Sequence, residues 1–264
     1  MIRSTRPIGV MDSGIGGLTV VRELQRILPG EDIIYFGDSA NCPYGNKSSD
    51  QIFELSKHML QFLGDNEVKC TAIACNTIST LVERLRPCFD YKIIGIVECA
   101  ARYVIAQKLA SVGLIATEFT VASGNYDRLI HEGLPETKVV GKGSPLLAAL
   151  VERGDFNQND INTEIRTQVE NILAREPVSH LILGCTHYPI VEDNFHQCYP
   201  NMTLINPALE QAEAVKRFLA EENALSEKSR GTFTVCTSGD PQVFLDVGKR
   251  LGLFEPSEVK VVHI

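Results

Sequence analysis

Short apolar runs alternate along the chain with amphipathic stretches of helix length. GLTVVRELQRILPG (17–30) has apolar residues at helical spacing, and so does SSDQIFELSKHMLQFLGDN (48–66), in which Ser49 or Asp50 is the expected N-cap. This alternation predicts an α/β fold in which crossover helices join parallel strands. The runs with the length and β-branched content of strands cover residues 8–12, 32–38, 70–75, 92–97, 111–117, 138–143, 180–185, 202–207 and 232–239.

The way the strands end suggests an internal repeat. IGVMDS (8–13) and VGLIAT (112–117) are apolar and end in a small hydroxyl residue, and each precedes a later strand that ends at a cysteine, Cys75 or Cys185. Ligands bind beyond the carboxyl ends of strands in open α/β sheets. We therefore predict two pseudosymmetric, doubly wound parallel-sheet domains with the active site in the cleft between them.

We expect residues 1–97 and 208–264 to form the first domain and residues 98–207 the second. The first domain is then discontinuous, because the strand at 232–239 returns to it.

Composition narrows the class of protein. The chain has 264 residues, of which 44% are apolar and 22% charged, as in ordinary globular proteins. A formal charge of -8 argues against a nucleic-acid partner. No apolar run approaches the ~18 residues of a membrane span, and MIRSTRPIGVMDSG has no apolar signal segment. We expect a cytoplasmic protein without a membrane partner.

In a reducing cytoplasm the eight cysteines would be thiols. Cys75 in ACNT and Cys185 in GCTH both follow a buried run and lead into a predicted helix, where backbone N–H groups favour a thiolate. Two thiols on opposite sides of one substrate carbon could remove a proton from one face and deliver a proton to the other, which inverts the configuration. We expect four other cysteines to serve only in packing, because their neighbours in the sequence are both polar and apolar: Cys70, Cys88, Cys198 and Cys236.

Six motifs occur in order along the chain: DSGIGGLTV (12–20), YFGD (35–38), NCPYGNKS (41–48), ACNT (74–77), GCTHYP (184–189) and TSGDPQVF (237–244). This ordered set resembles the glutamate racemases of the aspartate/glutamate racemase superfamily. The resemblance implies interconversion of L- and D-glutamate for peptidoglycan, and thus for cell wall biogenesis and cell shape. It also implies a homodimer that uses no metal, pyridoxal phosphate or other cofactor.

The same resemblance implies roles for individual residues. Cys75 and Cys185 match the catalytic thiols, Asp12 and His187 match the polar groups that assist them, and Glu152 matches an acid on the His187 side. The substrate-binding positions implied are Asp12, Ser13, Tyr44, Gly45, Asn76, Thr77, Thr117, Thr120, Thr186 and His187.

Other interpretations remain open. DSGIGGL could cradle a phosphate, but it lacks the G-x-G-x-x-G spacing and the P-loop Lys-Ser/Thr. Cys185 and His187 could be the nucleophile pair of a hydrolase, although residues i and i+2 of an extended chain point apart, so their contact requires a turn. Zinc bound by Cys75, Cys185 and His187 would lack the usual CxxC or HxxxH pairing.

Two further alternatives concern function. The substrate could be aspartate or another small amino acid, because the motifs do not specify the length of the pocket. The chain could also be a non-catalytic regulatory or binding protein that keeps the cleft.

Overall fold

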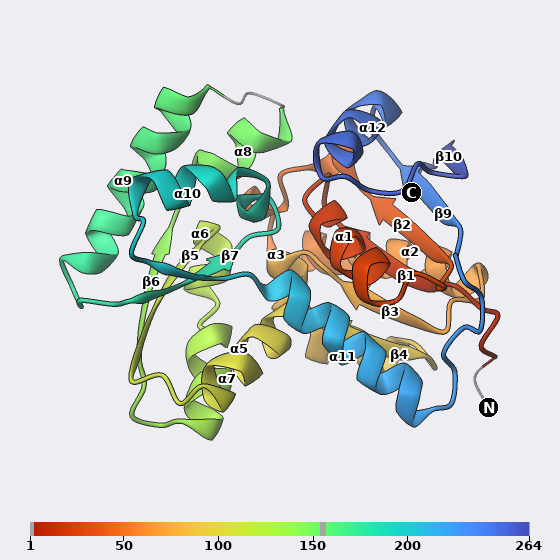
Figure 1. The fold of residues 1–264 in the computed structure, drawn as a ribbon, viewed down its shortest axis with the longest axis horizontal. Helices are drawn as coiled ribbons and strands as arrows, with labels where there is room; N and C mark the ends of the chain where they lie inside the picture. The colour runs from red at the N-terminus through yellow and green to blue at the C-terminus, as the bar shows by residue number, and fades with distance from the viewer. Residues whose placement is uncertain (1–2, 154–156, 264) are drawn as a thin grey trace.

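The computed structural model describes residues 3–153 and 157–263, which form two parallel β-sheets with helices packed around them (Figure 1). Every ladder between the described strands is parallel, as predicted. In spatial order the larger sheet contains β10 (Glu258–Val261), β9 (Phe233–Thr237), β2 (Ile33–Gly37), β1 (Ile8–Asp12), β3 (Cys70–Ile73) and β4 (Lys92–Gly95). The smaller sheet contains β6 (Lys138–Gly143), β5 (Ser111–Ala116), β7 (His180–Gly184) and β8 (Thr203–Ile205).

Both sheets are wound in the same way. β1 lies between β2 and β3 in the larger sheet, and β5 lies between β6 and β7 in the smaller one. At such a switch in strand order a crevice opens beyond the carboxyl ends of the strands. Asp12 ends β1 and Cys75 follows β3, while Thr117 follows β5 and Cys185 follows β7. The predicted fold of two pseudosymmetric, doubly wound sheets is confirmed.

Helices and 3₁₀ turns connect the strands. The α-helices are α1 (Leu18–Ile27), α2 (Ser49–Asp65), α3 (Asn76–Ser79), α4 (Val82–Leu85), α5 (Ile96–Ala106), α6 (Glu118–Ala122), α7 (Asn125–Gly133), α8 (Leu147–Glu152), α9 (Gln158–Leu173), α10 (Glu192–Cys198), α11 (Pro207–Glu221) and α12 (Pro241–Arg250). The 3₁₀ turns are η1 (Ser39–Asn41), η2 (Tyr44–Asn46), η3 (Arg86–Cys88) and η4 (Tyr188–Val191).

Helix α1 shows how the apolar pattern sets the packing. Leu18, Val21 and Leu24 recur at helical spacing and are completely buried, whereas Arg26 on another face is exposed. The helix packs against α11 and the larger sheet. It ends at Ile27, just before the predicted stop at Pro29.

The N-cap of α2 is Ser48, so the expectation of Ser49 or Asp50 was wrong. The Ser48 hydroxyl accepts from the Gln51 amide at 3.2 Å, and the Gln51 side chain accepts from the Ser48 amide at 3.0 Å. This reciprocal pair satisfies two N–H groups at the helix start, which neither Ser49 nor Asp50 could do from inside the helix.

The role of Cys88 also differs from the expectation. Cys70 and Cys236 are buried packing residues and Cys198 is partly buried, but Cys88 is exposed. It lies in η3, on a turn that faces solvent, so it does not serve the core.

The chain passes from the larger sheet to the smaller one at α5 and returns at α11 (Figure 1). β9 pairs with β2 and β10 in the larger sheet. We propose the domain division given above, with 1–97 and 208–264 around one sheet and 98–207 around the other. Within the described ranges, every helix falls short of the length or apolarity that crossing a bilayer requires.

Candidate active site

A pocket between the carboxyl ends of the two sheets brings most of the predicted site residues together. Cys75 and Cys185 both line it and are 6% exposed each. The full lining is Ser13, Cys42, Pro43, Tyr44, Gly45, Cys75, Asn76 and Thr77 from the larger-sheet half, and Thr117, Ala148, Cys185, Thr186 and His187 from the other.

On one side of the pocket, Cys75 is the N-cap of α3 and lies beside the turn that follows β1. Its sulfur is 3.5 Å from the Ser13 hydroxyl. Asp12, fully buried behind Ser13, accepts from the Gly14 amide at 3.0 Å and from the Thr186 hydroxyl at 2.9 Å. Because Thr186 belongs to the smaller-sheet half, Asp12 links the two halves.

Burial dominates the electrostatics of this side. It raises the pKa of the Cys75 thiol to about 12, and the nearby negative charge of Asp12 acts in the same direction. Burial also raises the pKa of Asp12 to about 6, although the positive charge of His187 opposes that rise. Cys75 is therefore held as a thiol near neutral pH, beside a carboxyl group that titrates near pH 6.

On the other side, Cys185 directly follows β7 and lies next to His187. Its sulfur is 3.5 Å from Nδ1 of His187. The chain turns here, because the Tyr188 amide donates to the Cys185 carbonyl oxygen at 3.1 Å. This turn brings Cys185 and His187 into contact, which an extended segment would prevent.

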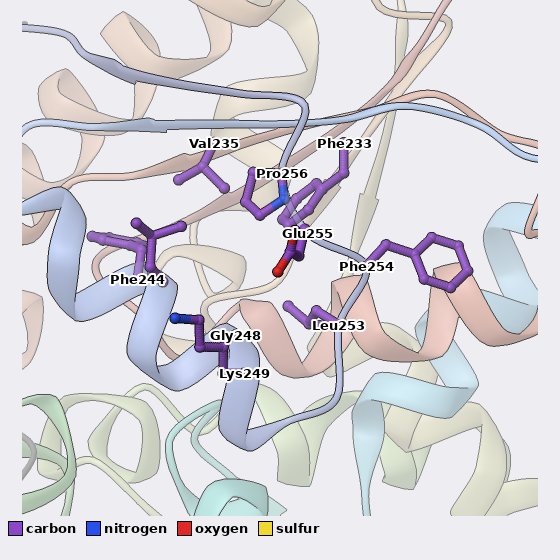
Figure 2. Close-up of a pocket in the computed structure, with 10 residues that line it drawn as sticks. Phe233, Val235, Phe244, Gly248, Lys249, Leu253, Phe254, Glu255 and Pro256 are labelled. Carbon is purple, nitrogen blue, oxygen red and sulfur yellow. The ribbon is translucent and has the colours of Figure 1, made fainter.

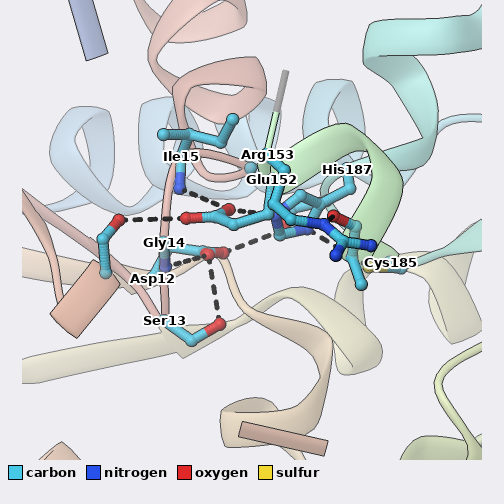
Figure 3. Close-up of polar contacts among 12 residues, drawn as sticks. Asp12, Ser13, Gly14, Ile15, Glu152, Arg153, Cys185 and His187 are labelled. Carbon is cyan, nitrogen blue, oxygen red and sulfur yellow. Dashed lines mark hydrogen bonds and ion pairs between the residues drawn. The ribbon is translucent and has the colours of Figure 1, made fainter. Parts of the chain in front are cut away.

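Glu152 completes this side from the end of α8 (Figure 3). Its Oε2 lies 2.5 Å from Nε2 of His187 and accepts from the Ile15 amide at 3.1 Å, and its Oε1 accepts from the Ser39 hydroxyl at 3.0 Å. Gly14 leaves room for the carboxylate, since a Cβ there would lie 2.4 Å from Oε1.

Glu152 and His187 form a buried ion pair. Burial favours the neutral form of each, but the pairing outweighs it in both cases. The pKa of Glu152 lies below its usual value because of the His187 contact, and the pKa of His187 lies well above its usual value because of Cys185 and Glu152. A protonated His187 places a positive charge beside the sulfur of Cys185.

Threonines join the two halves across the pocket. The Thr77 hydroxyl lies 3.0 Å from that of Thr117 and 3.3 Å from that of Thr120. Next to it, the side-chain Oδ1 of Asn76 accepts from the Tyr126 hydroxyl at 2.7 Å. The Asn76 side-chain NH₂ is buried and has no hydrogen-bond partner among the described residues, so it is a donor available to a ligand.

Tyr44 and Gly45, both in η2, form one wall of the pocket. The Tyr44 hydroxyl donates to the buried carboxylate of Asp38 at 2.6 Å. Gly45 packs against Thr117, since a Cβ at Gly45 would lie 3.4 Å from the Cβ of Thr117. The wall is therefore attached to both halves of the molecule.

Three predicted site residues do not line the pocket. Asp12, Thr120 and Glu152 lie behind it and contact residues that do. The pocket is also lined by three residues that were not predicted from the sequence, Cys42, Pro43 and Ala148. Cys42 and Pro43 precede Tyr44 in the same motif and could have been found there, whereas nothing in the sequence marks Ala148.

A second, mainly apolar pocket lies beside α12 and is lined by different residues, among them Phe233, Phe244 and Leu253 (Figure 2). Among residues 3–153 and 157–263, no group of three or more His, Cys, Asp or Glu side chains is placed to hold a metal ion.

Comparison with known proteins establishes the class to which this fold and pocket belong. The model of the family described as Asp/Glu/hydantoin racemase matches residues 8–215. The chain belongs to this family and is an amino-acid racemase, an isomerase.

Within the family, the chain is similar to glutamate racemases along nearly its whole length. It is 35% identical to the glutamate racemase of Thermoanaerobacter pseudethanolicus over 98% of this chain and 97% of that protein. A crystal structure of the Francisella tularensis glutamate racemase in complex with D-glutamate superposes with a TM-score of 0.91 at 33% identity, covering 98% of each chain. A Bacillus anthracis glutamate racemase isoform gives a TM-score of 0.93 at 30% identity, covering 99% of each chain.

Proposed function

We propose that this protein is a cofactor-independent glutamate racemase that interconverts L- and D-glutamate, with Cys75 and Cys185 as a pair of acid/base catalysts. The observation that carries the proposal is that two buried thiols from opposite halves line one pocket, each beside its own polar group. Similarity to proteins named glutamate racemase, one of them in complex with D-glutamate, supports glutamate as the substrate.

The two thiols have different neighbours. Cys75 has a raised pKa and lies beside the carboxyl group of Asp12, so it is a proton donor. Cys185 lies 3.5 Å from Nδ1 of His187, a ring whose pKa is held well above its usual value and which places a positive charge beside that sulfur. Each thiol has to be the acid in one direction of reaction and the base in the other, so exchange of protons with solvent would reset the pair between the two directions.

In the chemical step, one thiolate sulfur takes the α-proton of glutamate while the other thiol gives its proton to the opposite face of Cα. The C–H bond on one face breaks and a C–H bond on the other face forms, so the configuration inverts. The two cysteines exchange protonation states in the same step.

The substrate needs hydrogen-bond donors, because removing a proton next to a carboxylate builds further negative charge there. The Asn76 NH₂ and the hydroxyls of Ser13 and Thr186 are donors that line the pocket. Asp12 lies behind them, and its ionised carboxylate attracts the ammonium group of the substrate. Donors that meet the α-carboxylate should therefore contribute most in the transition state.

We further propose that the D-glutamate produced supplies peptidoglycan synthesis and that the protein is a homodimer, as the family resemblance implies. Sedimentation velocity of the purified protein tests the dimer: a single species at the mass of one 29.1 kDa chain would refute it.

The mechanism is tested by Cys75→Ser and Cys185→Ser, with Cys99→Ser as the matched control. Each active-site variant should lose at least about 100-fold in kcat/KM, because a serine hydroxyl is a far weaker acid than a thiol and its alkoxide, the form that could remove a proton, is hardly populated near neutral pH. The loss should be equal in both directions, since the equilibrium constant between enantiomers is one. Cys99 is buried and outside the pocket, so its variant should keep wild-type activity.

Wild-type rates in both active-site variants would refute the two-thiol mechanism. Comparing kcat/KM on glutamate and on aspartate separates the proposed activity from the main alternative. Efficient turnover of aspartate with little turnover of glutamate would show that aspartate is the substrate. The two-thiol mechanism would still hold.

A further inference from the structure

Gln211 lies on α11, the helix by which the chain returns to the larger sheet, and its side chain is completely buried. Its side-chain NH₂ donates to two backbone carbonyl oxygens, those of Ile73 and Ile94, both at 2.9 Å. Figure 1 shows α11 running from between the sheets across β3 and β4, and the helix contacts both strands.

The two carbonyl groups lie at the carboxyl ends of neighbouring strands. Ile73 is the last residue of β3, which continues through Ala74 into Cys75. Ile94 is next to the last residue of β4, which continues through Gly95 into α5, where the chain crosses to the smaller sheet. Gln211 therefore joins the strand that presents Cys75 to the strand that leads into the crossing.

A second hydrogen bond joins the segments that follow β3 and β4. The hydroxyl of Ser79 in α3 accepts from the Val97 amide in α5 at 3.2 Å. Gly95 allows this approach, because a Cβ there would lie 2.6 Å from the Ser79 hydroxyl oxygen. Since Cys75 is the N-cap of α3, its position depends on these two strand ends staying together.

The orientation of the Gln211 amide is determined by its partners. Turning the amide over would place its oxygen against two carbonyl oxygens, which would repel it. Its own carbonyl oxygen is buried and has no hydrogen-bond partner among the described residues. The side chain thus acts here as a double donor.

We propose that Gln211 is a positioning residue for Cys75: its amide holds the ends of β3 and β4 together and thereby fixes the thiol against the pocket. The catalytic consequence rests on the proposed role of Cys75, but the positional effect can be measured without any substrate.

The experiment compares Gln211→Met with Gln168→Met. Methionine keeps the size of glutamine and removes the donors. Gln168 is a matched control, since it is also buried, donates through its NH₂ to Glu164 at 3.0 Å, and has a carbonyl oxygen without a partner among the described residues. It lies on α9, against the smaller sheet.

Each protein is treated with iodoacetamide, and alkylation of Cys75 and Cys185 is followed by peptide mass spectrometry, so that Cys185 serves as the internal reference. In Gln211→Met the strand ends admit water, and Cys75 should be alkylated at least about fivefold faster while Cys185 changes little. kcat/KM should fall about tenfold, as expected for a small displacement of a catalytic group. Gln168→Met should leave the ratio of the two rates unchanged.

An unchanged ratio in a folded Gln211→Met, or equal acceleration of both thiols, would overturn the proposal. If that variant does not fold, Gln211→Asn gives the same test, because its shorter side chain cannot reach both carbonyls. A wild-type protein that fails to racemise glutamate would refute the proposed function and leave the alkylation result standing.

Discussion

At the residue scale, Asp12 is a carboxyl group whose burial costs stability. Its pKa is about 6 in the folded protein and near 3.8 when exposed, mainly because it is buried. The folded state thus binds this proton more tightly, so the penalty is absent at low pH and complete above about pH 6. The shift corresponds to about 3 kcal/mol of destabilisation at pH 8.

We predict that Asp12→Asn removes this penalty. The free energy of unfolding of the variant minus that of the wild type should increase by up to about 3 kcal/mol from pH 4 to pH 8. The rate of racemisation should fall. Urea unfolding across this pH range measures the change. If the difference in free energy of unfolding between the two proteins does not vary with pH, the raised pKa of Asp12 is contradicted.

The site residues that could be predicted from the sequence are reactive side chains at the ends of strands. Cys75, Cys185, Asp12 and His187 follow apolar runs and stand out by residue type. Ser39 was missed, since its contact with Glu152 joins residues from different halves, which no local pattern shows.

At the element scale, the start of α2 offers a test of the N-cap. Ser48→Ala should lower the free energy of unfolding by about 1 kcal/mol, because one N–H at the helix start loses its acceptor. Ser49→Ala, one residue inside the helix, should cost less. Both variants should keep full activity. Equal losses in the two variants, measured by urea unfolding, would show that Ser48 is not the cap.

Nine strands were predicted and found, because each is an apolar run between turn residues. β10 was missed: its sequence EVKV alternates charged and apolar residues at the edge of the larger sheet, where little is buried. The strand at 32–38 is shorter than predicted, since Asp38 turns out of the sheet to bind Tyr44.

At the scale of the whole molecule, Lys69 joins distant parts of the chain. Its buried ammonium group donates to the carbonyl oxygens of Ser4 at 3.0 Å and Ala224 at 2.9 Å, and pairs with Glu31. Glu31 also accepts from the Ser226 amide at 2.8 Å. This cluster fastens the segment after α11 to the larger sheet.

Lys69→Met should lower the free energy of unfolding by about 3–5 kcal/mol, because it leaves Glu31 buried without its cation. Lys138→Met removes an exposed pair with Glu176 and should cost less than about 1 kcal/mol. Adding Glu31→Gln to Lys69→Met should recover part of the loss. Chemical denaturation compares the variants, and similar losses for Lys69→Met and Lys138→Met would contradict this role.

The pseudosymmetric plan could be read from the repeated strand ends, but the contacts between the halves could not. Thr77 with Thr117, and Glu152 with Ile15, meet only because of how the two sheets are placed relative to each other. That placement depends on packing around α5 and α11, which the sequence pattern does not specify.

The most direct measurement is racemisation in D₂O. Purified protein is incubated separately with L-glutamate and D-glutamate, without added cofactor, and the α-proton is followed by NMR together with optical rotation. Two thiols acting on opposite faces predict that the inverted product carries deuterium from either starting enantiomer, while unreacted substrate keeps its proton at early times. Absence of exchange and inversion with both enantiomers, or inversion with the original proton retained, would contradict the account.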